Sequence, residues 1–191
     1  MPRAGLTPSA IVELALGVVD EDGLPALTLT AVAKRAGVAV PALYKHIRNL
    51  DELVHLLRVR IIEDLTELLT TDCVGRSGPD ALRALADTFR AYAVANPHRY
   101  ALTVQAAPPN TREAEAAVRM LTVFLAVLRG FGLDGPNAIH AARALRAACH
   151  GFAAIQAAGG FGLAEDVDVS YDLLVRMVIQ GLPLARELPT G

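Results

Sequence analysis

The chain has 191 residues, of which 53% are hydrophobic and 5% are aromatic, and it contains no tryptophan. A core built mainly from alanine, leucine and valine favours helices, so we predict a mostly helical protein. The net charge is −2, but residues 1–50 hold five Lys or Arg against four acidic residues, whereas the rest of the chain holds thirteen against sixteen. This balance excludes a uniformly basic surface and confines phosphate binding to the N-terminal part.

Several classes of protein are disfavoured by what the sequence lacks. Cys73 and Cys149 are too few for a disulfide framework and indicate a reducing compartment. The first residues lack the apolar core of a secretory signal, and no apolar run reaches the roughly 18 to 20 residues of a membrane span, so we expect a cytoplasmic protein without membrane contact. No metal-ligand spacing, phosphate-binding loop, dinucleotide fingerprint or nucleophile motif is present, so we expect no metal, no cofactor and no enzymatic activity.

The first predicted helix begins at the pair Thr7 and Pro8 and runs to Gly23. Thr7 is a suitable N-cap, and Pro8 fits the first turn, where a missing N–H has no cost. Apolar residues repeat at helical spacing between these ends. We expect this helix to support the two short helices that follow.

Two short helices joined by a glycine turn are predicted next. Thr30 is the candidate N-cap of the first, and Gly37 can adopt the positive φ that ends it. The second starts at Val40 with Pro41 in its first turn. The inward positions of the two helices are Val32, Ala33, Ala36, Leu43 and Ile47.

The outer face of this segment is basic. Between positions 34 and 48 the chain carries four basic residues and no acidic one: Lys34, Arg35, Lys45 and Arg48. Tyr44 adds an aromatic side chain beside them. Two small helices with a basic, aromatic-bearing face indicate a helix-turn-helix, whose second helix enters the major groove of DNA.

Residues 8–60 resemble the N-terminal DNA-binding domain of the TetR family of transcriptional repressors. The resemblance is carried by Leu27, Thr28, Val32, Ala33, Ala36, Gly37, Val38, Leu43, Tyr44, His46 and Ile47, followed by Asp51 and Glu52. It covers about a quarter of the chain. It implies a DNA-binding domain over residues 1–50 that binds double-stranded operator DNA through Thr28, Thr30, Val40, Pro41, Ala42, Tyr44, Lys45 and His46.

The alternative for these positions is a surface helix that happens to be basic, with Thr30 serving only as a cap and His46 packing against the supporting helices. The chain also departs from the family pattern. Ala39, Val40 and Ala42 stand where relatives often carry polar side chains. We therefore expect apolar contact with thymine methyl groups to contribute to base readout.

A long helix is predicted behind the helix-turn-helix. Asn49 is its candidate N-cap with Glu52 in a variant of the capping box. The expected apolar stripe is Leu53, Leu57, Ile61, Leu65 and Leu68. Glycines and a proline in residues 70–79 mark a break near the end of this helix, which links the N-terminal domain to a second domain, assigned to residues 51–191.

The rest of the chain predicts an all-α bundle for ligand binding and dimerisation, with helices over residues 80–96, 98–105, 111–129, 136–158 and 167–185. Pockets in helical bundles are mostly apolar with a few polar groups. The candidates to line one are Phe89, Tyr92, Tyr100, Phe124, Arg143 and His150. The alternative is that the aromatic residues are core and the polar ones face solvent.

The last two predicted helices are candidates for a dimer interface. Small residues crowd the helix over 136–158, and Gly151 inside it is unfavourable by about 1 kcal/mol unless close packing compensates. The expected interface residues are Gly151, Phe152, Tyr171, Leu174 and Val178. The His150–Gly151 pair also resembles a TetR subgroup with this pair in its penultimate helix.

These patterns predict a homodimeric TetR-like repressor that a small apolar effector, bound among the C-terminal helices, releases from its operator. The alternative is a helical sensor or interaction protein whose C-terminal domain binds a protein partner, with the DNA-binding unit as a tether. A catalytic helical bundle is a more distant alternative.

Overall fold

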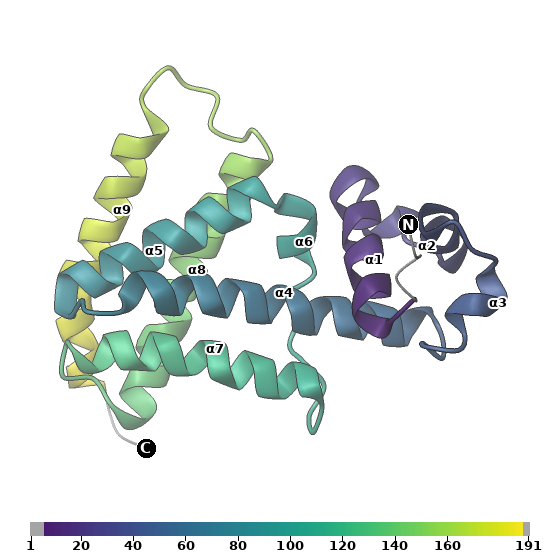
Figure 1. The fold of residues 1–191 in the computed structure, drawn as a ribbon. Helices are drawn as coiled ribbons and strands as arrows, with labels where there is room; N and C mark the ends of the chain where they lie inside the picture. The colour runs from purple at the N-terminus through teal and green to yellow at the C-terminus, as the bar shows by residue number, and fades with distance from the viewer. Residues whose placement is uncertain (1–5, 189–191) are drawn as a thin grey trace. The chain divides into compact units, whose positions relative to one another are not determined.

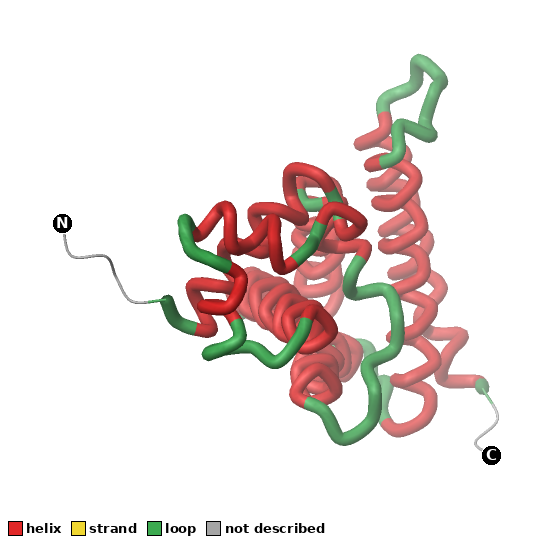
Figure 2. Tube along the Cα trace, turned by 90° about the vertical axis from the view of Figure 1, so that its right-hand side faces the viewer, coloured by secondary structure: helices red, strands yellow, loops and turns green. Residues whose placement is uncertain are grey.

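The computed structural model describes residues 6–188, and every regular element in that range is a helix (Figure 2). The α-helices are α1 (Pro8–Asp22), α2 (Leu29–Ala36), α3 (Val40–Leu43), α4 (Leu50–Cys73), α5 (Gly78–Ala95), α6 (Pro97–Ala101), α7 (Arg112–Arg129), α8 (Gly135–Ala157) and α9 (Val167–Gly181). Two short 3-10 helices, η1 (Leu24–Ala26) and η2 (Leu182–Glu187), complete the set. The predicted all-α class is confirmed.

The helices form two compact units (Figure 1). The first contains the described residues up to Glu63 together with Asn96–Ala116, and the second contains Asp64–Ala95 together with the described residues from Ala117. Helices α4 and α7 therefore each begin in the first unit and end in the second. The expected functional division into residues 1–50 and 51–191 remains a prediction.

The first unit is built around α1. Thr7 caps this helix as predicted, with its Oγ1 accepting a hydrogen bond from the Ala10 amide at 3.1 Å. The core of this unit is built from side chains of α1, α2, α3 and α4, and its fully buried members include Ile11, Ala15, Leu16, Val19, Val32, Leu43, Leu53, Leu57 and Ile61.

Helix α6 belongs to the first unit, although sequence reasoning assigned it to the C-terminal domain. The Arg99 guanidinium binds the Asp20 carboxylate of α1 through two hydrogen bonds of 2.5 and 2.6 Å. His98 Nδ1 lies 3.1 Å from the Asp20 carbonyl oxygen. A segment 79 residues away in sequence is thus held against the end of α1.

Two details of the first three helices differ from expectation. Thr28, not Thr30, is the N-cap of α2, so the helix begins two residues earlier than predicted. Thr28 has an extended backbone, and its Oγ1 accepts a hydrogen bond of 3.0 Å from the Ala31 amide. Regular helix in α3 ends at Leu43. The next turn is still helix-like, since the Ile47 amide donates to the Leu43 carbonyl, and both side chains are buried as predicted.

Helix α4 follows its prediction except near its end. Asn49 accepts a hydrogen bond from the Glu52 amide at 2.8 Å, which confirms the predicted cap. The apolar stripe advances in steps of four residues, so it continues from Leu65 to the fully buried Leu69, while Leu68 is 46% exposed. Assigning Leu68 to the core was therefore wrong.

The second unit packs α5 against α8, with α9 and η2 beside them. Phe89 and Phe124 meet edge to face with ring centroids 6.2 Å apart. Arg83 reaches Asp172 at 2.6 Å, and Arg90 reaches Asp168 at 2.6 Å, so two ion pairs hold α5 to α9.

Helices α6 and α9 are shorter than predicted. α6 ends at Ala101 rather than residue 105, and the Thr103 hydroxyl donates to the Tyr100 carbonyl beyond its end. α9 ends at Gly181 rather than residue 185, because Pro183 lacks an N–H and its ring opposes a continued α-helix. Among the described residues, none of the helices is long and apolar enough to cross a membrane.

Candidate DNA interface and ligand cavities

The turn between α2 and α3 depends on one glycine. Gly37 has φ 67° and ψ 32°, the left-handed conformation that ends helices, and its N–H bonds to the carbonyls of Ala33 and Lys34. A Cβ at this position would meet nothing within 4 Å, so the requirement for glycine is conformational and not steric. This turn sets the direction in which α3 leaves α2.

Helix α3 presents a mainly apolar outer surface. Its inner residue Leu43 is fully buried and anchors it to the unit, whereas Pro41 is exposed and Val40 and Ala42 are half-buried. Tyr44 follows directly and is 56% exposed. An exposed aromatic side chain next to exposed apolar ones is unfavourable in water, which suits a surface that meets another molecule.

Polar candidates surround this surface. Lys45 is exposed and His46 is half-buried. Thr30 is exposed in the first turn of α2. Thr28 is exposed too, but its hydroxyl oxygen already accepts the Ala31 amide. All eight residues predicted to contact DNA thus belong to one short stretch of the first unit.

The basic residues of this stretch are not equally available. Arg35 forms two hydrogen bonds with Glu21, 2.7 and 2.8 Å long, which lower the pKa of Glu21 and raise that of Arg35. Glu52 accepts a hydrogen bond from the Arg48 amide and pairs with its side chain at 3.2 Å, and the backbone bond is the main cause of its lowered pKa. Within residues 6–188, Lys34 and Lys45 form no ion pair.

A buried carboxylate joins α4 to the start of α7 inside the first unit. Glu113 is 2% exposed, and its Oε2 lies 2.9 Å from His55 Nδ1. Its Oε1 lies 3.9 Å from Arg58 Nη1, while Arg58 Nη2 donates to Gln105 Oε1 at 3.2 Å. The Glu113 carboxylate thus lies beside two side chains of α4 that are one helical turn apart, which places the first turn of α7 next to that helix.

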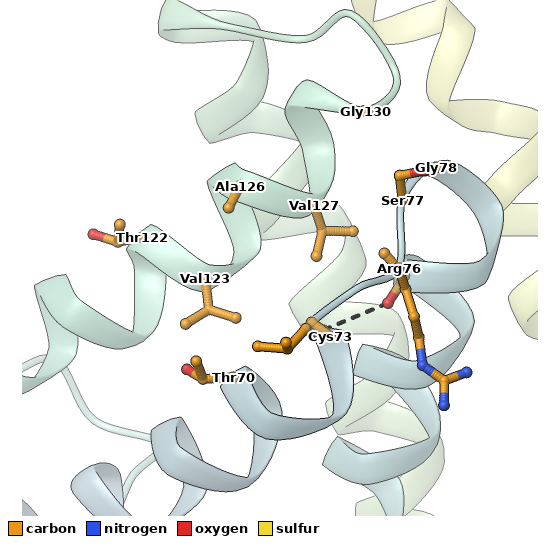
Figure 3. A pocket seen from close by; sticks show the side chains of 12 residues that line it. Thr70, Cys73, Arg76, Ser77, Gly78, Thr122, Val123, Ala126, Val127 and Gly130 are labelled. Carbon is orange, nitrogen blue, oxygen red and sulfur yellow. Dashed lines mark hydrogen bonds between the residues drawn. The ribbon is translucent and has the colours of Figure 1, made fainter.

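The second unit contains a cavity of about 340 Å³ between the end of α4 and α7 (Figure 3). Val123 and Val127 of α7 point toward Cys73, with Thr70 beside them, and the Arg76 guanidinium points away. Burial raises the pKa of the Cys73 thiol. This cavity offers apolar walls and a weakly polar rim without a charged group directed into it.

A second cavity, of about 300 Å³, lies between α7 and α8, and we call it the α7–α8 groove. Its walls are Ala117, Val118, Met120, Leu121, Phe124, Ile139, Ala142, Arg143 and Arg146. Apart from the two arginines, every lining residue is apolar. This combination of an apolar wall and convergent polar groups is typical of small-molecule sites.

The predicted ligand residues are divided by the fold. Phe124 and Arg143 share the α7–α8 groove. Phe89 and Tyr92 are buried in α5, and Tyr100 is buried in the first unit. His150 is half-buried. Sequence reasoning missed Arg146, although its spacing of three from Arg143 on a predicted helix was a usable signal.

The predicted interface residues are also divided. Tyr171 is 2% exposed, its ring lies 5.0 Å from that of Phe152, and its hydroxyl donates to the Ala86 carbonyl at 2.5 Å. It therefore offers no side-chain surface to a partner. Gly151, Phe152, Leu174 and Val178 are half-buried. The apolar residues that α9 exposes most are others at helical spacing: Val169, Leu173 and Met177, each more than half exposed.

The described residues also give little support for a reactive cysteine or a metal site. Burial raises the pKa of Cys149 to about 11, which leaves its thiol protonated and unreactive near neutral pH. Residues 6–188 contain no cluster of His, Cys, Asp or Glu able to hold a metal ion. What the fold does define is a helix-turn-helix DNA-binding protein with a helical second unit that contains cavities.

Comparison with known proteins agrees with this class. Residues 11–57 match the family model of bacterial regulatory proteins of the tetR family, and residues 82–178 match that of the tetracyclin repressor-like C-terminal domain. The chain belongs to the TetR family of transcriptional regulators, and is therefore a DNA-binding regulator and not an enzyme. The subgroup suggested by His150–Gly151 remains a prediction.

Relatives of similar length support the assignment. The chain is 35% identical to the uncharacterized HTH-type transcriptional regulator Rv0681 of Mycobacterium tuberculosis, over 91% of this chain and 81% of that one. It is 31% identical to the uncharacterized regulator YobS of Bacillus subtilis, over 95% of both. A TetR variant from Acinetobacter baumannii AYE, solved in complex with minocycline, has the same fold, with 20% identity, a TM-score of 0.73, and coverage of 95% of this chain and 99% of that one.

Proposed function

We propose that the protein is a homodimeric repressor that leaves its operator when a small molecule binds in the second unit. DNA binding is supported by the apolar and aromatic surface of α3, which is exposed beside the left-handed turn at Gly37. Binding of an effector is supported by the α7–α8 groove. The minocycline complex of a protein with the same fold supports the proposal that this architecture accommodates a ligand.

Base readout in this proposal is largely apolar. Val40, Pro41 and Ala42 offer methyl and methylene groups where hydrogen-bonding side chains would otherwise stand. The 5-methyl group of thymine is the apolar feature of the major groove. We therefore assign sequence preference to thymine contacts by α3, with Lys45 and the end of α2 positioned for phosphates.

The dimer is formed by α8 and α9. The apolar stripe of Val169, Leu173 and Met177 on α9 and the 48% exposed Ile155 on α8 need cover from water. A second copy supplies the same stripe, as a two-fold interface requires. Two helix-turn-helix units then read half-sites about 34 to 36 Å apart.

Coupling runs through the two helices that pass between the units. Helix α7 starts in the first unit, where Glu113 lies beside His55 and Arg58 of α4, and four residues later it forms a wall of the groove. A ligand that shifts α7 therefore also acts on α4, directly behind the helix-turn-helix. If α7 has one arrangement that allows operator binding and another that does not, the ligand lowers operator affinity only by the difference in its affinity for the two arrangements.

The first test measures binding of the protein to DNA from upstream of its own coding region across a salt series, with an unrelated duplex for comparison. We expect selective binding to two-fold half-sites, with Tyr44→Ala reducing affinity by about 10- to 100-fold, equivalent to about 1.4 to 2.7 kcal/mol. Because Tyr44 is 56% exposed, its removal should leave thermal stability unchanged.

The matched control is Val104→Ala, an exposed apolar residue of the same unit outside the helix-turn-helix, which should bind DNA normally. Equal affinity of Tyr44→Ala and the parent protein for a selected operator would contradict the proposed role of α3. The rival function, a DNA-tethered interaction protein, is favoured if a protein partner co-purifies in fixed stoichiometry and no ligand alters operator affinity.

A further inference from the structure

The α7–α8 groove has a charge arrangement that limits what can bind there. Helix α8 carries His140, Arg143, Arg146 and His150 but no aspartate or glutamate in all of Gly135–Ala157. None of the residues that line the groove is acidic. The groove is therefore apolar along its walls and positively charged at one side.

The two arginines occupy neighbouring positions. Residues three apart on a helix lie on the same face, with Cβ atoms roughly 5 to 6 Å apart, and two like charges at this spacing repel each other. Arg143 is exposed, and the described residues give it no ion pair. A bound anion would be attracted to the Arg143 guanidinium, and Arg146 on the same face of the helix adds a second positive charge beside it. The planar donor fork of arginine suits carboxylate and similar oxyanions.

The walls opposite this charge favour a hydrocarbon body. Met120, Phe124 and Ala142 are buried and form apolar surface within the groove. The volume of about 300 Å³ corresponds to about ten water-sized groups and lies at the lower end of the range for small-molecule pockets. A ligand of this size can fill the apolar part while its charged end remains near Arg143.

We infer that the α7–α8 groove binds a small organic anion, a carboxylate or sulfonate on an apolar body of about ten heavy atoms, with Arg143 and Arg146 holding the charged group. This inference deepens the proposed effector function, on which it rests, by naming the chemical class of the effector. It also distinguishes the groove from the cavity between α4 and α7, where the only arginine of the lining, Arg76, points away (Figure 3).

The test titrates the full-length protein with octanoate by isothermal calorimetry, below the concentration at which octanoate forms micelles. Two probes separate charge from hydrocarbon: 1-octanol keeps the chain without the charge, and acetate keeps the charge without the chain. We expect one saturable octanoate site per chain with a millimolar or tighter Kd and much weaker binding of both other probes.

Variants assign the charge to the groove. Arg143→Ala should weaken octanoate binding by about 10-fold or more without changing octanol binding, and Arg143→Lys should lie between it and the parent. The matched control is Arg129→Ala, which removes an exposed arginine of the same unit outside the groove. Because Arg143 is exposed, all variants should unfold at the parent temperature and keep the parent mass in solution.

Several results would overturn the inference. These are no saturable octanoate binding, equal affinity for octanoate and octanol, an unchanged Kd in Arg143→Ala, an equal loss in Arg129→Ala, or a change of oligomeric state in Arg143→Ala in place of a loss of binding. Operator affinity is measured in parallel. Arg143-dependent octanoate binding without operator release would uphold the ligand class and refute the effector role, whereas failure to bind DNA selectively would refute the regulator proposal alone.

Discussion

The helix-turn-helix and the outer surface of α8 and α9, with Ile155, Val169, Leu173 and Met177, both expose apolar side chains. They differ in how clearly the sequence marks them. In the first, Gly37 adopts a left-handed conformation, and α3 is anchored by the buried Leu43 and Ile47. These special positions follow one another within eleven residues, so the pattern is specific. On α8 and α9, helical periodicity alone does not show which apolar face is buried inside the chain. The exposed apolar face can be identified only after the buried face has been located in the structure.

The two regions also differ in how their positive charges are paired. Near α3, two of the four basic residues between positions 34 and 48 are already paired with Glu21 and Glu52. Helix α8 has no acidic residue to pair with its two arginines internally. Positive charge on the DNA-binding unit is thus partly neutralised by the chain itself, whereas the described residues give Arg143 of α8 no ion pair.

The largest effect should come from the α9 stripe. Leu173→Glu combined with Met177→Glu places two carboxylates on an exposed apolar face, where they cost little in a monomer but oppose a two-fold contact. We expect a monomeric protein whose operator affinity falls by about 100-fold or more, because the second half-site no longer adds to the first. Light scattering and fluorescence anisotropy measure the two changes. A double variant that stays dimeric would show that the interface lies elsewhere.

A smaller effect should come from the DNA. Replacing thymine by uracil removes only the 5-methyl group, and we expect a loss of about 0.8 kcal/mol, about fourfold in affinity, for each methyl contacted by α3. The measurement is a competition assay with an operator substituted one position at a time. The control is uracil outside the half-sites. If no substitution lowers the affinity, α3 does not read the operator through thymine methyl groups.

The smallest effect concerns Gly151. A Cβ at this half-buried helical position meets nothing within 4 Å in the chain, so alanine should stabilise the helix by about 0.5 to 1 kcal/mol. We expect this gain in the monomeric Leu173→Glu/Met177→Glu background, measured by urea unfolding. In the dimer we expect the gain to disappear, because close packing against a second copy would be disturbed. Equal stabilisation in both backgrounds would remove Gly151 from the interface.

Most of the helices could be predicted from the sequence, because the local capping and turn signals agree with the helix ends in the tertiary structure. Thr7 and Asn49 cap the helices they were predicted to cap, and Gly37 ends α2. Two errors are displacements by one or two positions. Thr28 rather than Thr30 caps α2, and Leu69 rather than Leu68 is buried, because neighbouring residues of the same type fit the local sequence pattern equally well.

The candidate site was less accessible, for a different reason. The all-helical class and the helix-turn-helix were predictable from residue order alone, since that motif is local and depends on backbone conformation. Only the tertiary structure placed α6 beside α1 through Arg99 and Asp20, buried Tyr171 beneath Phe152, and brought Phe124 to the same groove as Arg143. These contacts join helices distant in sequence, and helical periodicity specifies which face is apolar but not which helix will cover it.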